Sequence, residues 1–171
     1  LPATASNEFT SAAINVYTNS TGSAVDWIAN GALSLNGISL NAMSVANTTS
    51  TSAKTFAAWL NGQSGATGVT AAASTEINVT KKQVNFGQGL TINGTTISNA
   101  HTATTLSQLA DRIGASSATT GVDAHIGVDD NLILTNTFGN EGKNIVIGST
   151  SGPNTLGIND ATYSGKLKLS A

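Results

Sequence analysis

The chain has 171 residues, a net charge of −2 and no cysteine, and only 9% of its residues are charged. Its seven basic residues give no electrostatic footprint for a nucleic acid and no basic amphipathic stretch that would hold a membrane. Thr, Ser and Asn fill 62 positions, which favours strands and turns, while 39% hydrophobic residues exclude a disordered polar tract. We therefore expect a β-rich α+β protein with one domain or two small ones.

The first segment, residues 1–32, is predicted to hold an N-terminal strand over residues 13–17 and a connecting segment. The last segment, residues 149–171, is predicted to end in a returning strand that can pair with residues 1–32. In that strand Leu167 and Leu169 point inward, and lysines alternate with them on a solvated face. The sequence begins and ends abruptly, so we expect it to be part of a longer protein.

Residues 33–89 and 90–148 read as two copies of one pattern, which predicts one structural unit per copy. Each copy runs Leu-x-(Leu/Ile)-Asn-Gly, then apolar residues at helical spacing, then Thr-Gly-Val-x-Ala. The Asn-Gly pair predicts a hairpin turn, because both residues tolerate positive φ. The residues that carry the pattern are Asn36, Gly37, Phe56, Leu60, Gly68 and Val69 in the first copy, and Asn93, Gly94, Leu109, Ala110, Ile113, Gly121 and Val122 in the second.

The middle element of each copy is predicted to be a short helix. In the second copy the apolar stripe follows Thr104 and Thr105, either of which can cap the helix, and Gly114 marks its end. In the first copy Asn61 and Gly62 close the helix. Thr-Gly-Val then opens a strand, so each copy is predicted to be a β-β-α-β-β unit, a small antiparallel sheet covered by one helix. Whether the copies share a sheet or form separate domains stays open.

The aromatic residues look dispersed along the sequence, which argues against a flat platform for sugars. Trp59 takes the helical position that Arg112 has in the second copy. We interpret Trp59 as core packing, with a contact to the neighbouring copy as the alternative. Trp27, Tyr17 and Tyr163 lie outside the two helices.

No catalytic, metal-binding or cofactor-binding site is predicted, and we do not expect an enzyme. Asp129 and Asp130 are adjacent but lack the spacing of a calcium loop, so they predict a turn. Asp123 and His125 share one face of a predicted strand, where a zinc site would need two more ligands. The chain contains no Gly-x-Ser-x-Gly nucleophile elbow.

The ordered set Leu-x-Ile-Asn-Gly-Thr, Leu-Ala-x-x-Ile, Thr-Gly-Val-x-Ala and Leu-x-Leu-Thr resembles the repeat of the variable central region of bacterial flagellins and of some hook-associated proteins. Residues 158–171 also resemble the stretch by which that region returns to the rest of flagellin. The first copy departs from the pattern, since it lacks a Thr after Asn-Gly. The long helices that polymerise flagellin have no counterpart here.

The resemblance implies the surface-exposed central domains of flagellin, the outer part of the filament, in an extracellular protein exported without a cleaved signal peptide. Other flagellin subunits are then its partners in the filament. The fragment alone is monomeric, and antibodies, phages and host surfaces meet it first. The alternatives are a hook-associated or filament-cap protein and, from a different class, a carbohydrate-binding adhesin module. Family resemblance also implies O-linked sugars, for which the polar candidates are Thr48, Thr49, Ser50, Thr51, Ser52, Thr102 and Thr104.

Overall fold

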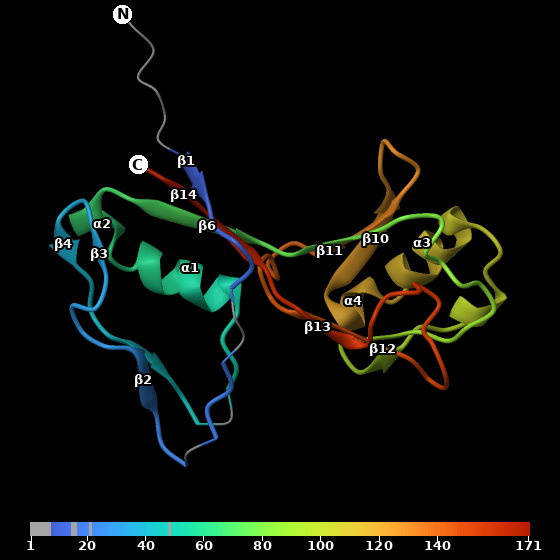
Figure 1. Cartoon of the computed structure of the whole chain (residues 1–171), viewed down its shortest axis with the longest axis horizontal. Coiled ribbons are helices and arrows are strands. Elements are labelled where there is room, and N and C mark those ends of the chain that lie inside the picture. Colours follow the sequence, from blue (N-terminus) through green and yellow to red (C-terminus); the bar gives the residue numbers. More distant parts are fainter. Residues whose placement is uncertain (1–7, 15–16, 21, 48) are drawn as a thin grey trace, which may run out of the picture. The chain divides into compact units, whose positions relative to one another are not determined.

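The computed structural model contains 32% strand and 18% helix, arranged as small antiparallel sheets with a few short helices (Figure 1). This mixed, strand-rich composition is what the sequence predicts. The structure describes residues 8–14, 17–20, 22–47 and 49–171. The chain divides into unit 1, residues 1–73 and 164–171, and unit 2, residues 74–163. None of the helices in the described part is long and apolar enough to cross a membrane.

Unit 1 joins the beginning and the end of the chain in one sheet. Its elements are β1 (Glu8–Thr10), β2 (Val25–Ile28), β3 (Ser34–Leu35), β4 (Ile38–Ser39), β5 (Met43–Val45), α1 (Ala53–Asn61), α2 (Ser64–Thr67), β6 (Thr70–Ser74) and β14 (Lys166–Ser170). Strand β14 lies between β1 and β6 (Figure 1), and it runs antiparallel to β1 with Phe9 opposite Leu169. An exposed ion pair between Lys168 and Glu8, at 2.9 Å, joins the same two strands.

The described strand near the N-terminus is therefore β1, and it pairs with the returning strand. The strand predicted over residues 13–17 is not seen at its described positions, and residues 15 and 16 lie outside the described part. On β14, Leu167 is buried and the half-buried Leu169 packs against the same core, while Lys166 and Lys168 are exposed. The alternation of Leu and Lys thus fits a strand with one buried face.

The core of unit 1 is small and rich in alanine. Among the described residues its buried cluster consists of Leu40, Ala53, Ala57, Leu60, Ala71 and Leu167. Helix α1 supplies half of this cluster from one face, and Ser52 caps its start through a bond from the backbone nitrogen of Thr55. Larger, half-buried side chains, among them Phe56 and Trp59, pack against this cluster.

Unit 2 contains ten elements between the two strands of unit 1 that flank it in sequence. They are β7 (Glu76–Val79), β8 (Thr91–Ile92), β9 (Thr95–Thr96), the 3-10 helix η1 (Ala100–Thr102), α3 (Leu106–Gly114), α4 (Ser117–Thr120), β10 (Val122–Ile126), β11 (Leu132–Asn136), β12 (Ile145–Gly148) and β13 (Ala161–Tyr163). They form a three-stranded sheet of order β10-β11-β7 and a four-stranded sheet of order β13-β12-β8-β9.

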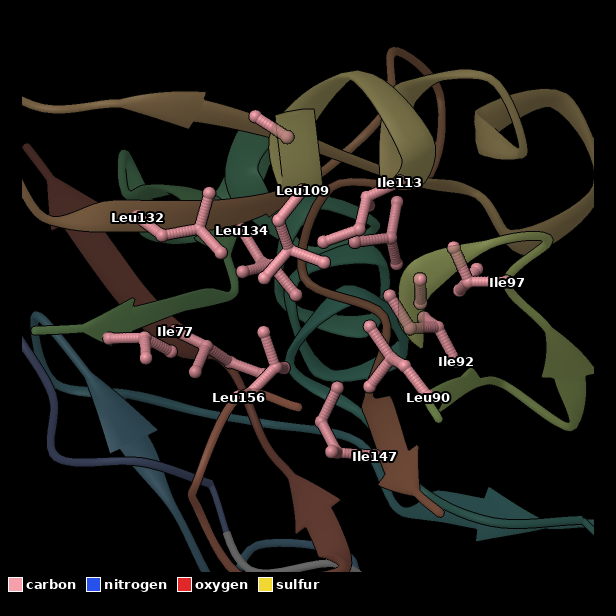
Figure 2. Close-up of a cluster of buried hydrophobic side chains, with 14 of the residues drawn as sticks. Ile77, Leu90, Ile92, Ile97, Leu109, Ile113, Leu132, Leu134, Ile147 and Leu156 are labelled. Atoms are coloured by element: carbon pink, nitrogen blue, oxygen red, sulfur yellow. The ribbon is translucent and has the colours of Figure 1, made fainter. Parts of the chain in front are cut away.

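The core of unit 2 is large and aliphatic. Its buried cluster has seventeen members, drawn from both sheets, from α3 and from the connecting segments. Figure 2 shows Leu109 and Ile113 pointing from α3 into this cluster, and both are fully buried. Leu134 on β11 and Ile92 on β8 belong to the same cluster, so the apolar stripe of α3 shares one core with residues of both sheets.

The division between the units falls at residues 73/74 and 163/164, rather than at the segment ends 89 and 148 suggested by the sequence pattern. The reason is non-local strand pairing. Strand β7, which lies in the segment 33–89, pairs with β11 in unit 2, with Ile77 opposite Leu134. The strand that pairs with β6 is instead β14, from the end of the chain.

Candidate functional site

The turn of the hairpin β8–β9 is locked by the side chain of Asn93. Asn93 and Gly94 have φ values of +51° and +77°, as a tight hairpin turn requires. The Nδ2 of Asn93 donates to the carbonyl oxygen of Thr120 at 2.8 Å, and its Oδ1 accepts from the backbone nitrogen of Val146 at 2.8 Å. One amide therefore ties the hairpin to the end of α4 and to β12.

The turn of the hairpin β3–β4 has the same backbone conformation, but its asparagine makes one side-chain hydrogen bond where Asn93 makes two. Asn36 and Gly37 have φ values of +49° and +77°. The Nδ2 of Asn36 donates to the carbonyl oxygen of Thr67 at 2.8 Å, which is the counterpart of the bond to Thr120. Among the described residues nothing donates to its Oδ1, because β3 and β4 form a two-stranded sheet with no neighbouring strand.

A Thr-Gly step ends the short second helix in both units. Gly68 and Gly121 have φ values of +68° and +70°, a conformation that glycine adopts without strain. The hydroxyls of Thr67 and Thr120 accept from the backbone nitrogens two residues later, at 3.2 and 3.1 Å. The Thr-Gly-Val pattern is thus a helix end followed by a strand, with the buried threonine satisfying the turn.

The predicted boundaries of the two longer helices agree with the structure at the start of α3 and at the ends of both helices. Thr105 caps α3 by accepting from the backbone nitrogen of Gln108. Gly114 is the last residue of α3 and Gly62 is the C-cap of α1, and the capping residues Ala115 and Gly62 both have right-handed helical geometry. Neither glycine reverses the chain, because a short second helix follows each one. The left-handed glycines come at the ends of those helices.

The predicted pattern residues fall into three structural groups. Asn36, Gly37, Asn93 and Gly94 form turns, and Gly68 and Gly121 cap helices. The buried members are Leu60, Val69, Leu109, Ala110, Ile113 and Val122. Phe56 is half-buried and packs against the core of unit 1. These residues have structural roles, and no catalytic group is among them.

The aromatic residues of unit 1 are not dispersed, which corrects the expectation from the sequence. Tyr17, Trp27, Phe56 and Trp59, here called the aromatic row, follow one another with ring centroids 6.2, 5.8 and 5.2 Å apart. All four are half-buried. Trp59 packs against the core and its Nε1 donates to the carbonyl oxygen of Ala42, so the packing interpretation of Trp59 is confirmed. The signal was missed because 42 residues separate the ends of the row.

Unit 2 has a polar cavity of about 240 Å³ beside the Asn93 turn. Thr119, Asn136, Asn140 and Lys143 line it, and Lys143 is its one charged lining residue. The Oδ1 of Asn136 is buried without a hydrogen-bond partner. This lining can donate and accept hydrogen bonds, but it includes no carboxylate or imidazole that would act as a general base.

A carboxylate organises the loop between β12 and β13. Asp160 accepts from the side chain of Asn154 at 2.7 Å and from the backbone and hydroxyl of Ser149 at 3.0 and 2.8 Å. The bond from Asn154 and those from Ser149 hold the pKa of Asp160 below its ordinary value. Burial, and then the charge of Asp160, raises the pKa of Tyr163. These groups fix the loop between β12 and β13.

The other candidate chemical groups do not converge. Asp130 has a φ of +54° in the turn between β10 and β11, beside Asp129. Asp123 and His125 are exposed on β10, opposite Thr135 and Ile133. No group of three or more His, Cys, Asp or Glu side chains that could hold a metal ion occurs among the described residues.

The glycosylation candidates separate by exposure. Thr49, Ser50, Thr102 and Thr104 are exposed, and Thr48 lies outside the described residues. Thr51 and Ser52 are 1% and 7% exposed, so we correct the prediction by removing both. The hydroxyl of Thr51 accepts from the backbone nitrogen of Tyr17, and Ser52 is the cap of α1.

No protein-family model matches this chain, and no curated protein matches it either.

Proposed function

We propose that this chain is the surface-exposed central region of a bacterial flagellin, which forms the outer part of the flagellar filament. The observation that carries the proposal is the agreement between the two segments that bear the flagellin-like pattern. In both, an Asn side chain in a left-handed hairpin turn donates at 2.8 Å to the carbonyl oxygen of the Thr that precedes a left-handed Gly. We infer that the segments are two copies of one structural unit.

The pairing of the first described strand with the last supports the proposal. Strand β1 and strand β14 run antiparallel side by side, with Glu8 opposite Ser170. The start of β1 and the end of β14 therefore lie at the same end of the sheet. An outer domain of a filament subunit needs this arrangement, because both of its connections lead back to the same core.

The surface chemistry supports a structural role. Small polar side chains fill much of the chain and only 9% of residues are charged, which limits nonspecific electrostatic adhesion. The polar cavity beside the Asn93 turn offers hydrogen-bonding groups without a carboxylate or an imidazole. On this proposal the mechanism is passive: stable units present a hydrated face and contact neighbouring subunits laterally.

Immunogold labelling with antibodies to this chain, on whole cells of the source bacterium, tests the proposal. Gold along the whole filament is the expected result. Gold confined to the hook junction or the tip would assign the chain to the hook-associated or cap proteins instead. Gold on the cell body beside bare filaments would overturn the flagellar proposal.

The aromatic row favours one alternative, a carbohydrate-binding adhesin module. Half-buried aromatic rings keep part of their surface free, and such surfaces pack against the apolar faces of sugars. Saturable binding to a glycan, lost in Trp27→Ala, would support it. Phe138→Ala in unit 2 is the matched control, because Phe138 is 99% exposed and lies outside the row.

We also propose O-linked glycans on the exposed candidates Thr49, Ser50, Thr102 and Thr104. Their exposure and their polar surroundings motivate this assignment. The intact mass of protein purified from its source tests it, because a mass equal to that of the unmodified chain would exclude any glycan.

A further inference from the structure

The chain contains four Asn-Gly steps, at Asn30, Asn36, Asn61 and Asn93. The backbone nitrogen of Gly31, which follows Asn30, is engaged in a bond to the carbonyl oxygen of Leu40 at 2.8 Å, and the structure holds the side chains of the other three asparagines differently. Asn-Gly is the step at which an asparagine most readily loses its amide, because glycine leaves the following backbone nitrogen unhindered. The reaction needs that nitrogen to approach the side-chain carbon Cγ in a near-attack geometry. Any contact that holds the amide away from the nitrogen slows it.

Asn61 and Asn93 are held at both ends of the amide. The Nδ2 of Asn61 donates to the carbonyl oxygen of Ala71 at 2.8 Å, and its Oδ1 accepts from the nitrogen of the same residue at 2.7 Å. The nitrogen of Gly62 is itself engaged in a bond to Ala58 at 3.0 Å. Asn93 has bonds at both Nδ2 and Oδ1, and its hairpin belongs to a four-stranded sheet.

Asn36 is held at one end only. Its single side-chain bond among the described residues runs from Nδ2 to Thr67. Its hairpin has two strands of two residues each, with no neighbour in the sheet. A two-stranded ribbon is marginally stable and opens locally more often than a strand inside a larger sheet. Asn36 and Gly37 are both exposed, so water and hydroxide reach them.

We propose that Asn36 is a site of spontaneous deamidation in the folded protein, and that Asn93 and Asn61 are protected. The nitrogen of Gly37 loses its proton to hydroxide and attacks Cγ of Asn36, a C–N bond forms, and the side-chain nitrogen leaves as ammonia. Water then opens the resulting succinimide at either carbonyl, which gives aspartate or isoaspartate. No oxidant or reductant takes part, and the product carries one additional negative charge.

The product no longer has the donor that binds Thr67. A carboxylate at position 36 faces a carbonyl oxygen in place of the present bond, and isoaspartate lengthens the backbone by one methylene within the turn. Both products weaken the link between the hairpin β3–β4 and the end of α2. The modification therefore changes the charge and the local order of unit 1 together.

The test compares amide loss at the three asparagines by peptide mapping with mass spectrometry, after incubation in mildly alkaline buffer. In the folded protein we expect Asn36 to react about fivefold faster than Asn93, since one more hydrogen bond of ordinary strength must break at Asn93. Asn61 should be the slowest.

The same protein unfolded in urea is the matched control. Glycine follows all three asparagines, so the three rates should converge when the fold is removed. Asn36→Ser should abolish the rapid charge change seen by isoelectric focusing of the folded protein. Equal rates at Asn36 and Asn93 in the folded state would overturn the proposal. So would an Asn36 that keeps its amide when folded and loses it when unfolded.

Discussion

Units 1 and 2 carry the same turn, helix and glycine geometry but stabilise it by different means. In unit 2, β10 pairs with the strand that follows it, and α3 covers a buried cluster of seventeen residues. In unit 1, β6 pairs with β14 from the far end of the chain, and the described buried cluster has six residues, three of them alanine. The shared pattern therefore specifies the local conformation of the turns and helices. The strand partners and the core residues that complete each unit come from other parts of the chain.

The aromatic row adds large, half-buried rings to the small core of unit 1. Phe56 and Trp59 project from α1 and pack against the small core, and Trp27 reaches Phe56 from β2. Large rings bury much area per residue, so a few of them offset the lack of aliphatic volume. Both tryptophans of the chain lie in unit 1, and their fluorescence therefore reports its unfolding separately.

Removal of residues 164–171 should have the largest effect on stability, because it should unfold unit 1 and leave unit 2 folded. The deletion takes out the central strand of the sheet β1-β14-β6, including the buried Leu167. We expect unit 1 to unfold, since the loss exceeds the ~5 kcal/mol at the lower end of domain stability. Tryptophan fluorescence should show an unfolded unit 1 while backbone amide NMR signals of unit 2 stay dispersed. Persistence of the native tryptophan signal would show that β14 is dispensable.

A matched pair of helix substitutions sharpens the contrast between the two cores. Leu109→Ala in α3 should cost about 4 kcal/mol, because Leu109 is fully buried in a well-filled aliphatic cluster. Leu60→Ala in α1 should cost about 2–3 kcal/mol, because its smaller surroundings with half-buried rings can relax around the lost volume.

Urea unfolding measures both, with tryptophan fluorescence for unit 1 and NMR for unit 2. Each substitution should move the transition of its own unit. Equal shifts of both transitions by Leu109→Ala would mean that the units unfold as one, and a larger effect for Leu60→Ala would reverse the ranking of the cores.

Local features of both units could be predicted from the sequence, because neighbouring residues determine them. The Asn-Gly turns follow from positive φ at both positions, and the start of α3 follows from Thr105 before an apolar stripe. The ends of α1 and α3 could likewise be predicted, at Gly62 and Gly114. The short helices α2 and α4 that follow were not predicted, although each ends at a glycine that comes after a threonine with a buried hydroxyl, Thr67 or Thr120. That signal was available, as a Thr precedes the glycine in both copies.

Apart from the pairing of the returning strand with the N-terminal segment, the strand partners could not be predicted, because pairing depends on residues far apart in the sequence. Nothing in β6 distinguishes a partner that follows it from β14, which lies about 100 residues later. The aromatic row could not be predicted for the same reason. Tyr17 stacks on Trp27, and Trp27 contacts Phe56, which lies 29 positions later in the sequence. The two amide bonds of Asn93 likewise depend on Thr120 and Val146.

The two turn asparagines, Asn93 and Asn36, should contribute to stability in proportion to the number of side-chain hydrogen bonds that each one makes. Asn93→Gly preserves the positive φ and removes two side-chain bonds, which should destabilise unit 2 by about 2 kcal/mol. Asn36→Gly removes one bond and should destabilise unit 1 by about 1 kcal/mol. Urea midpoints of the two units give both values. An Asn36→Gly effect as large as that of Asn93→Gly would contradict the difference between the hairpins.

The smallest expected effect is a pH dependence of the stability of unit 2, caused by the titration of Asp160. Bonds from Asn154 and Ser149 keep the pKa of Asp160 below its ordinary value of 3.8 in the folded state. Folding is therefore favoured by this group above the unfolded pKa, and that contribution is lost as the pH falls through the folded pKa. Asp160→Asn keeps the shape and an acceptor but cannot titrate.

The stability of unit 2, followed by NMR in urea at a series of acid pH values, should fall more steeply in the native sequence than in Asp160→Asn. The tryptophan transition of unit 1 provides the reference, because Asp160 lies outside unit 1 and the substitution should leave that transition unchanged at every pH. Identical acid dependence in the native sequence and the variant would mean that the loop between β12 and β13 does not rely on the charged form of Asp160. The difference between the units would then lie in their cores and strand partners alone.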